Sequence, residues 1–547
     1  MKHNFSMIPR ADIPRSSFDR SHGYKTTFDA GYLVPFFVDE ALPGDTFKAD
    51  LNMFCRLATP IVPFMDNLFL ETFFFAVPIR LIWDNWQKFN GEQENPGDST
   101  DFLVPQIQAP EGGWQYGSLA DYMGIPTGVG GLKTSALWHR AYNLIWNEWF
   151  RDENLQTTQW MHKDDGPDPA EHYILLRRGK RHDYFTSCLP WPQKGPGVEL
   201  PLGGVAPLTT VDPIAPFYLN DASGSSYSMY GGSAEYAENY IRASANLTKS
   251  VSTPGTTVAP WTDPPDNYTA PSNTQYRLGI MTSPLASSLQ ADLSSATATT
   301  INSLRQAFQI QKLYERDARG GTRYTEILRA HFGVVSPDAR LQRPEYLGGT
   351  SGRININPVA QTSASDTTTP QGNLAAFGVY ADSKHAFTKS FVEHCVILGL
   401  VNVRADLTYQ QGLNRMFSRQ TRFDFYWPAL AHLGEQAVLN KEIYAQGNAT
   451  DDDVFGYQER WAEYRYKPSL ITGKFRSTDP QSLDVWHLSQ KFDNLPKLNA
   501  DFIIDQPPIS RVVAVQDEPQ FLFDSYMRLK CVRPMPVYSV PGLVDHF

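Results

Sequence analysis

The sequence predicts a mainly β protein built on an antiparallel sandwich, with a few short helices. Runs of alternating apolar and polar residues lie near both ends of the chain, few helical stretches separate them, and Pro and Gly punctuate the runs. Strands grouped in this way favour antiparallel sheets over alternating βαβ units. With 547 residues, roughly three or four domains are expected unless one fold carries long insertions.

Two segments predict half-buried strands. Apolar side chains occupy the odd positions from Phe47 to Leu57 and again, with Ser525 between them, from Phe521 to Cys531. The run from Leu68 to Val77 is almost continuously apolar, which is typical of a strand covered on both faces or pressed into a subunit contact. Further strands are expected over 392–403, 457–466 and 510–515.

Two other segments predict amphipathic helices. The first runs from Ser135 to Asn154 and places Leu137, Ala141, Leu144, Ile145 and Trp149 along one stripe. The second runs from Ser303 to Arg319 and ends at a pair of glycines. Both are expected to pack on the sheet or on a neighbouring subunit.

Two regions stand apart from this pattern. Residues 1–25 carry five basic and two acidic side chains without apolar periodicity, so we interpret them as an extended basic N-terminal arm, with residues 26–547 forming one domain with insertions. Residues 196–300 hold only 3 basic and 8 acidic side chains among Ser, Thr, Pro, Gly and Ala. A loop this long is uncommon in a compact domain unless it is functional, so we expect an outward insertion over about 195–300.

The composition limits the classes of function. Lys and Arg number 48 and Asp and Glu 58, so the formal net charge of -10 excludes condensation of nucleic acid by bulk charge. Charged residues make up 19% and aromatic residues 13%. Because subunit interfaces are enriched in aromatic side chains and depleted in charge, we expect much of the surface to be buried against other subunits.

No catalytic constellation is found. The phosphate-loop and HExxH patterns are absent, and the four cysteines lie more than a hundred residues apart, which indicates neither a zinc site nor a disulfide framework. The acidic stretch from Asp164 to Asp168 is interpreted as a solvated turn rather than a cation site. We therefore expect no enzyme, no cofactor, no metal and no membrane insertion. A lectin or carbohydrate-active enzyme with Trp platforms stays open as the rival class.

The strongest basic run is Arg177 to His182, which is followed by Tyr184, Phe185 and Trp191. Cationic groups neutralise phosphates and flat rings stack on bases, so this composition suits single-stranded nucleic acid. A solvated turn, or an arginine cluster bound to the carboxylates of a neighbouring subunit, explains the run equally well.

Several long stretches together resemble the major capsid proteins of the Microviridae, small single-stranded DNA phages, and most closely the gokushovirus branch. They are MIPRADIPRSSFDRSHGYKTTFDAGYLVPFFVDEALPGDTF (7–47), DNLFLETFFFAVP (66–78), LPWPQKG (189–195), RYTEILRAHFG (323–333), GYQERWAEYRYKPS (456–469) and GKFRS (473–477). The resemblance spans nearly the whole chain, although residues 196–300 match only in length and composition.

The resemblance implies an eight-stranded antiparallel jelly roll of the viral capsid type, with long loop insertions. It further implies that sixty copies assemble into a T=1 icosahedral shell around a circular ssDNA genome. The large insertion would form a threefold protrusion that contributes to host recognition. The implied partners are a small basic DNA-binding protein, scaffold and pilot proteins, and a receptor on the host cell surface. The implied location is the virion, assembled in the cytoplasm of a bacterial host. Besides the capsid protein and the lectin, a spike or portal component is the third class of protein that stays open.

Three sets of residues are predicted to contact the genome, a neighbouring subunit or the host. Those facing ssDNA are Arg10, Arg15, Arg20, Lys25, Arg178 and Arg181. Those at subunit interfaces are Phe73, Phe74, Phe75, Trp138 and Trp149. Those of the host-recognition insertion are Tyr227, Tyr230, Tyr236 and Trp261.

Overall fold

The computed structural model describes residues 14–198, 301–321, 323–333, 342–363 and 370–538, together with six short strands between residues 208 and 291. The chain divides into two compact units. The first contains residues up to Pro196 and from Leu313 onward, and the second runs from Gly197 to Lys312.

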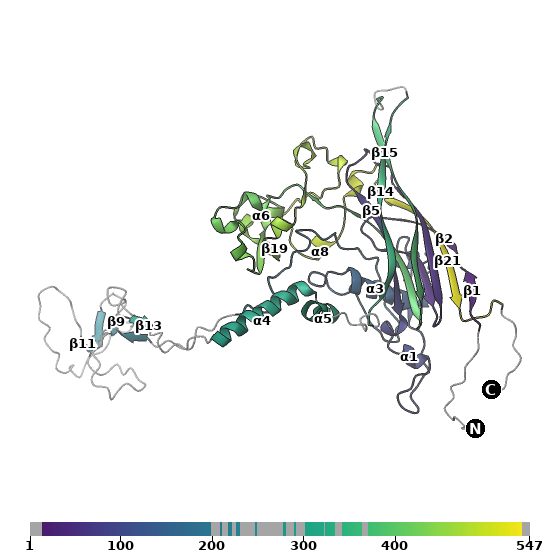
Figure 1. Ribbon diagram of the computed structural model, residues 1–547, viewed down its shortest axis with the longest axis horizontal. Helices are drawn as coiled ribbons and strands as arrows, with labels where there is room; N and C mark the ends of the chain where they lie inside the picture. Colours follow the sequence, from purple (N-terminus) through teal and green to yellow (C-terminus); the bar gives the residue numbers. More distant parts are fainter. Residues whose placement is uncertain are drawn as a thin grey trace. The chain divides into compact units, whose positions relative to one another are not determined.

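The first unit is built on one antiparallel sheet of nine strands in the order β1-β21-β4-β15-β14-β5-β16-β3, with β2 also paired to β21 (Figure 1). The strands are β1 (Ser16–Asp19), β2 (His22–Phe28), β3 (Val34–Ala41), β4 (Thr46–Leu57), β5 (Leu68–Pro78), β14 (Glu345–Ala360), β15 (Leu374–Ser390), β16 (Cys395–Ala405) and β21 (Phe521–Arg533).

These nine strands fill eight positions in the sheet. Strand β4 pairs with β21 along nearly its whole length, so β1 and β2 must share the other edge of β21, one after the other. The two outer edges of the sheet are therefore β1 with β2, and β3. These two edges lie close together: the hydroxyl of Tyr24 in β2 donates a hydrogen bond of 3.3 Å to the carbonyl of Pro35 in β3. The result is a strongly curled antiparallel sheet, which confirms the predicted mainly β, jelly-roll type of fold.

The period of two in β4 and β21 has the consequence that was predicted. Every odd residue of β4, from Phe47 to Leu57, is buried, and so is every odd residue of β21 from Phe521 to Cys531. These side chains point into the curl, where the ring of Phe523 meets the ring of Phe36 from β3 at 5.6 Å. The core thus joins strands from both ends of the chain.

Strands β5 and β16 are buried on both faces, as the continuous apolar run of β5 predicted. One face, with Phe74, lies in the interior of the curl, and the other, with Phe75, packs under a second hydrophobic cluster. That cluster includes buried residues of α3 (Leu137–Ile145), which continues into a π-helical turn over Trp146–Phe150. The helix predicted over 135–154 is therefore confirmed from Leu137 to Phe150, and residues 151–154 are not helical.

The remaining helices are short apart from α4. They are α1 (Trp86–Phe89), α2 (Leu119–Tyr122), α4 (Ile301–Gly320), α5 (Tyr324–Phe332), α6 (Asn440–Ile443), α7 (Ala462–Arg465) and α8 (Ala500–Ile503). Minor strand pairs are β6 (Gln106–Gln108) with β7 (Lys133–Ser135), β17 (Thr408–Tyr409) with β20 (Ser469–Leu470), and β18 (Glu435–Leu439) with β19 (Val454–Glu459). The helix predicted over 303–319 is confirmed by α4.

Two strand predictions were wrong in part. The segment 457–466 is a strand only to Glu459 and then turns into α7, and 510–515 contains a 3-10 turn and a single bridge from Val513 to Pro60. The sequence analysis also missed β14 and β15, two long neighbours in the centre of the sheet (Figure 1). Their glycines and polar residues obscure the apolar alternation, and pairing with β5 and β4 stabilises them instead.

In the second unit, β9 (Phe217–Asn220), β10 (Ser226–Met229), β11 (Leu247–Thr248) and β12 (Arg277–Gly279) form one sheet in the order β11-β10-β9-β12. Strand β8 (Leu208–Thr210) pairs with β13 (Leu289–Ala291). The insertion predicted over 195–300 falls almost entirely in this unit.

Candidate functional site

The basic run Arg177–His182 lies against carboxylates of the same chain. Arg178 is ion-paired with Glu71 of β5, and Arg181 reaches the same carboxylate at 3.3 Å. Arg404 of β16 donates to Glu71 at 2.9 Å from the neighbouring strand. The Glu71 side chain is only 11% exposed, so three guanidinium groups surround one nearly buried carboxylate.

The electrostatics of this cluster follow from burial and charge. Burial opposes the charged form of Glu71, but Arg178, Arg404 and Arg181 together hold the pKa of that carboxyl below its usual range. Burial, with the repulsion of Arg404, lowers the pKa of Arg178 to about 10. Two of the four cations of the run, Arg178 and Arg181, are ion-paired in this cluster, and the rings of Phe73 and Phe69 lie against them.

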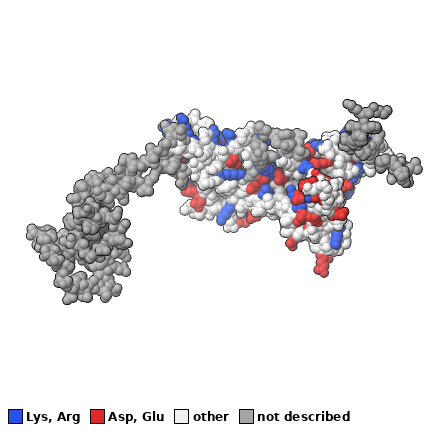
Figure 2. All heavy atoms as spheres, turned by 90° about the horizontal axis from the view of Figure 1, so that it is seen from below, with Lys and Arg blue, Asp and Glu red and all other residues white. Residues whose placement is uncertain are grey.

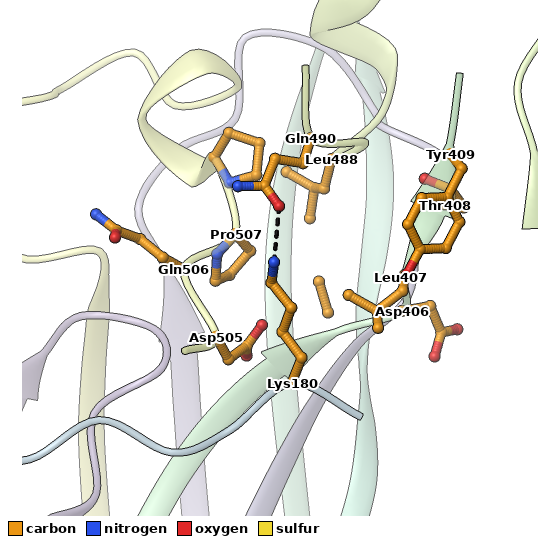
Figure 3. Close-up of a pocket in the computed structure, with 12 residues that line it drawn as sticks. Lys180, Asp406, Leu407, Thr408, Tyr409, Leu488, Gln490, Asp505, Gln506 and Pro507 are labelled. Carbon is orange, nitrogen blue, oxygen red and sulfur yellow. Dashed lines mark hydrogen bonds between the residues drawn. The ribbon is translucent and has the colours of Figure 1, made fainter. Parts of the chain in front are cut away.

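A small cavity of about 20 Å³ lies beside this cluster, between Lys180 and Tyr409 (Figure 3). The Lys180 ammonium donates to the Gln490 side chain at 2.9 Å, and the Asp505 carboxylate lies beside the same lysine (Figure 3). Burial lowers the pKa of Lys180 to about 8 and raises that of Asp505 to about 7. The cavity has room for about one water, so it is part of the packing and not a ligand site.

The prediction that Arg178 and Arg181 face ssDNA is therefore corrected, because both are ion-paired with Glu71 of the same chain and Arg181 also pairs with Asp406 at 3.4 Å. The alternative of an arginine cluster bound to carboxylates was closer, but the carboxylates belong to the same subunit. The missing signal was Glu71, a lone acid in an apolar strand that lies 107 residues from Arg178.

The basic arm predicted over residues 1–25 is corrected for its described part, because residues 16–19 and 22–28 are paired strands of the main sheet, whereas residues 1–13 lie outside the described residues. Arg20 forms an ion pair with Asp39, and Lys25 pairs with Asp524 at the surface. Arg15 donates to the Gly44 carbonyl and to the Thr46 hydroxyl. Arg10 lies outside the described residues.

The acidic stretch from Asp164 to Asp168 is not a solvated turn throughout. The Asp168 side chain is fully buried and accepts from the Arg140 Nε at 2.8 Å and from the Tyr173 hydroxyl. Asp165 accepts from the Trp83 indole at 2.7 Å. Among the residues that the structure describes, no group of three or more His, Cys, Asp or Glu side chains is placed to hold a metal ion.

The aromatic residues predicted at subunit interfaces divide into two groups. Phe74 and Phe75 are 0% and 1% exposed within the single chain, so these two predictions are corrected: both rings are core residues and offer no surface to a neighbour. Phe73 and Trp138 are partly buried against the second cluster. Trp149 keeps 36% of its surface exposed.

The structure shows a different exposed aromatic surface, which the sequence analysis missed. It is formed by residues 413–433 and 460–467, here called the basic-aromatic surface. Seven of its rings are 42–69% exposed: Phe417, Phe423, Phe425, Tyr426, Trp427, Tyr464 and Tyr466. Exposed apolar groups gathered in this way indicate an interaction site. The signal in the sequence was the alternation of arginines and rings in RMFSRQTRFDFYW (415–427).

The structure gives no side-chain contacts for the residues predicted to act in host recognition. Tyr227 lies in β10, and Tyr230, Tyr236 and Trp261 lie outside the described residues.

Comparison with known proteins decides the family. The family described as "Capsid protein (F protein)" matches residues 6–543. The chain belongs to this family of capsid proteins. It is 50% identical to the capsid protein VP1 of Bdellovibrio phage phiMH2K, over 100% of this chain and 98% of the relative. It is 48% identical to the VP1 of Chlamydia phage 1, over 99% and 98%, and 39% identical to the VP1 of Spiroplasma virus 4, over 99% and 97%.

The resemblance to Microviridae major capsid proteins is thereby confirmed, and the chain is a structural capsid protein of the virion rather than an enzyme. The capsid protein shows both signs of charge interspersed among neutral side chains on the face in Figure 2, consistent with its modest net charge. Its four cysteines are buried free thiols. Within the described part of the chain, no helix has the length and apolar character to cross a membrane.

Proposed function

We propose that sixty copies of this capsid protein assemble into a closed T=1 icosahedral shell that encloses a circular ssDNA genome. The full-length match to the capsid-protein family carries this proposal. The many large apolar side chains that are exposed on the single chain support the proposal, because monomeric soluble proteins rarely expose large contiguous apolar patches.

Closure requires heterologous contacts around the fivefold and threefold axes and isologous contacts at the twofold axes. Each contact can be weak, because every subunit makes several at once and the effective concentration of the next contact is high. Burial of apolar surface supplies roughly 25 cal/mol per Å², less the cost of ordering side chains.

The test is the size and symmetry of the purified protein. Closed particles seen by electron microscopy, eluting as a megadalton species in size-exclusion chromatography, are expected. A monomer or small oligomer with sugar affinity would support the lectin, and a ring of low copy number would support a spike or portal component. Either result would overturn the proposal.

We also propose that the insertion over 195–300 forms a threefold protrusion and contributes to host recognition. Its low charge and its separation from the main sheet as a compact unit support this role, since such a segment varies without disturbing the fold. Deletion of residues 223–273 should leave particles intact in electron micrographs and abolish infection. Loss of particles would contradict the separation of the two roles.

The proposed partners are the packaged genome, a small basic DNA-binding protein, scaffold and pilot proteins, and a receptor on the host surface, with assembly in the bacterial cytoplasm. The net charge of -10 supports the need for a basic partner to compact the DNA, because the shell protein does not neutralise it in bulk.

A further inference from the structure

The basic-aromatic surface combines exposed aromatic rings with basic side chains. Residues 413–433 and 460–467 contain six basic and two acidic side chains, although the whole chain is acidic. The two segments form one surface: the Tyr464 hydroxyl lies 3.3 Å from the backbone nitrogen of Tyr426, and Arg419 pairs with Glu463 at 3.4 Å. The indole of Trp461 donates to the Leu430 carbonyl at 2.9 Å.

Guanidinium groups support the exposed rings from one side. Arg422 lies 4.7 Å from the ring centre of Trp427, and Arg419 lies 4.3 Å from that of Tyr464. A ring held in this way keeps surface open to solvent: Trp427 is 42% exposed and Tyr464 is 51% exposed. Arg422 has no carboxylate partner among the described residues, so its charge remains available to a ligand.

A polar cavity of about 160 Å³ opens beside these rings. It is lined by four bases, Arg415, Arg419, Lys441 and Arg460, and by three carboxylates, Asp424, Glu442 and Glu463. Glu442 and Glu463 are paired with Arg415 and Arg419, and Asp452 pairs with Lys441. Arg460 lies over the Trp461 ring and has no ion pair among the described residues.

Two guanidinium nitrogens at this cavity lack a hydrogen-bond acceptor. The Nε atoms of Arg419 and Arg460 are buried without a partner, and so is the Ser418 hydroxyl. Arg460 thus has neither an ion pair nor an acceptor for its Nε among the described residues, so its charge is left for a ligand that brings acceptor oxygens. Phosphate oxygens are such acceptors, and arginine is the side chain suited to them.

We propose that the basic-aromatic surface binds single-stranded nucleic acid, with phosphates at Arg422 and Arg460 and bases stacked on the exposed rings of Trp427 and Tyr464. The inference rests on the proposed enclosure of a single-stranded genome and assigns the residues that contact it. Basic side chains interleaved with aromatic rings are the composition that binds single-stranded nucleic acid without sequence choice. Subunit interfaces are also enriched in aromatic side chains and arginine, so a second copy of this chain is the rival occupant that the experiment has to distinguish.

The experiment measures binding of a fluorescein-labelled oligo-dT to the full-length protein as free subunits, by anisotropy at several salt concentrations. Trp427→Leu should weaken binding roughly five- to 150-fold, the range for loss of one stacked base. Arg422→Gln and Arg460→Gln should each reduce the slope of log affinity against log salt by about 0.7. Phe54→Leu and Arg56→Gln, which change exposed residues on the outer face of β4, are the matched controls and should leave binding unchanged.

Particle formation by the same variants separates this inference from the proposed function. Variants that assemble normally but bind oligo-dT weakly, and carry less DNA by the 260/280 nm absorbance ratio of purified particles, support the inference. Variants that fail to assemble yet bind oligo-dT like the unchanged protein would show that a second copy covers this surface, which overturns it. Absence of oligo-dT binding by the unchanged protein at 50 mM salt would also overturn it. If the unchanged protein forms no closed particles even with the proposed scaffold protein present, the proposed function fails, whatever the oligo-dT result.

Discussion

Arg20 and Asp39 join the two outer edges of the curled sheet. Arg20 lies between β1 and β2, Asp39 lies in β3, and the guanidinium donates two hydrogen bonds to the carboxylate at 2.6 and 2.9 Å. The Asp39 side chain is 6% exposed, whereas that of Arg20 is 39% exposed. Beside this pair, the ring of His22 stacks on Phe37 at 5.8 Å. A bidentate pair and a stacked ring thus stabilise the curl where no backbone ladder continues.

The first prediction concerns this pair. Arg20→Gln should lower the free energy of unfolding by about 1.5–3 kcal/mol, because a nearly buried carboxylate loses two charge-assisted hydrogen bonds. Urea unfolding of free subunits measures the change. Lys25→Gln is the control, since its pair with Asp524 is exposed and worth about 0–1 kcal/mol. Equal effects of the two variants would mean that the pair does not hold the edges together.

The second prediction concerns Glu71. Glu71→Gln should destabilise the subunit by about 3–5 kcal/mol, because Arg178 and Arg404 would be left as buried charges without a counter-ion. Thermal unfolding measures it, and Glu393→Gln, which breaks the more exposed pair with Arg80, should cost much less. If Glu71→Gln unfolds at the unchanged temperature, the cluster is not structural and its arginines become available again as ligands for DNA.

The third prediction concerns pH. His139 is fully buried between the rings of Trp114 and Tyr173, and burial, opposed by the charge of Asp168, lowers its pKa to about 4 from an ordinary 6.5. Between those two pH values only the unfolded chain takes up the proton on this histidine. The contribution of His139 to the free energy of unfolding is therefore fully present above pH 6.5 and is lost as the pH falls toward 4. The shift corresponds to about 3 kcal/mol.

His139→Phe removes this titration, so the variant should lose less stability than the unchanged protein between pH 7.5 and pH 4.5. Urea midpoints at the two pH values measure the difference. A pH dependence in His139→Phe identical to that of the unchanged protein would rule out this histidine as its source.

The fourth prediction separates core from surface aromatics. Phe75→Ala should destabilise the subunit by about 3–5 kcal/mol, because the ring packs against Trp149, Phe150 and Tyr346. Phe54→Ala, on the same sheet but 45% exposed, should cost less than about 1 kcal/mol. Phe74→Asp should give insoluble chains rather than folded, unassembled subunits, since the charge would be buried. Soluble, folded Phe74→Asp subunits in circular dichroism would contradict this assignment.

The sequence by itself determined the strands whose burial has a simple period. In β4 and β21 the alternation of side chains across a strand decides which residues face the core, and this local geometry needs no knowledge of partners. The long motifs likewise determined the family. The glycine-rich β14 carried no such signal, because its order comes from β5 and β15 on either side.

Only the tertiary structure decided which charges are free. A run such as Arg177–Arg181 has the same composition whether it faces solvent, DNA or a carboxylate, and its partner Glu71 lies on a distant strand. The fold brings that carboxylate to Arg178 and leaves Arg422 and Trp427 at the surface. Coulomb interactions depend on distance in space and on exposure to water, and neither can be read from the order of residues along the chain.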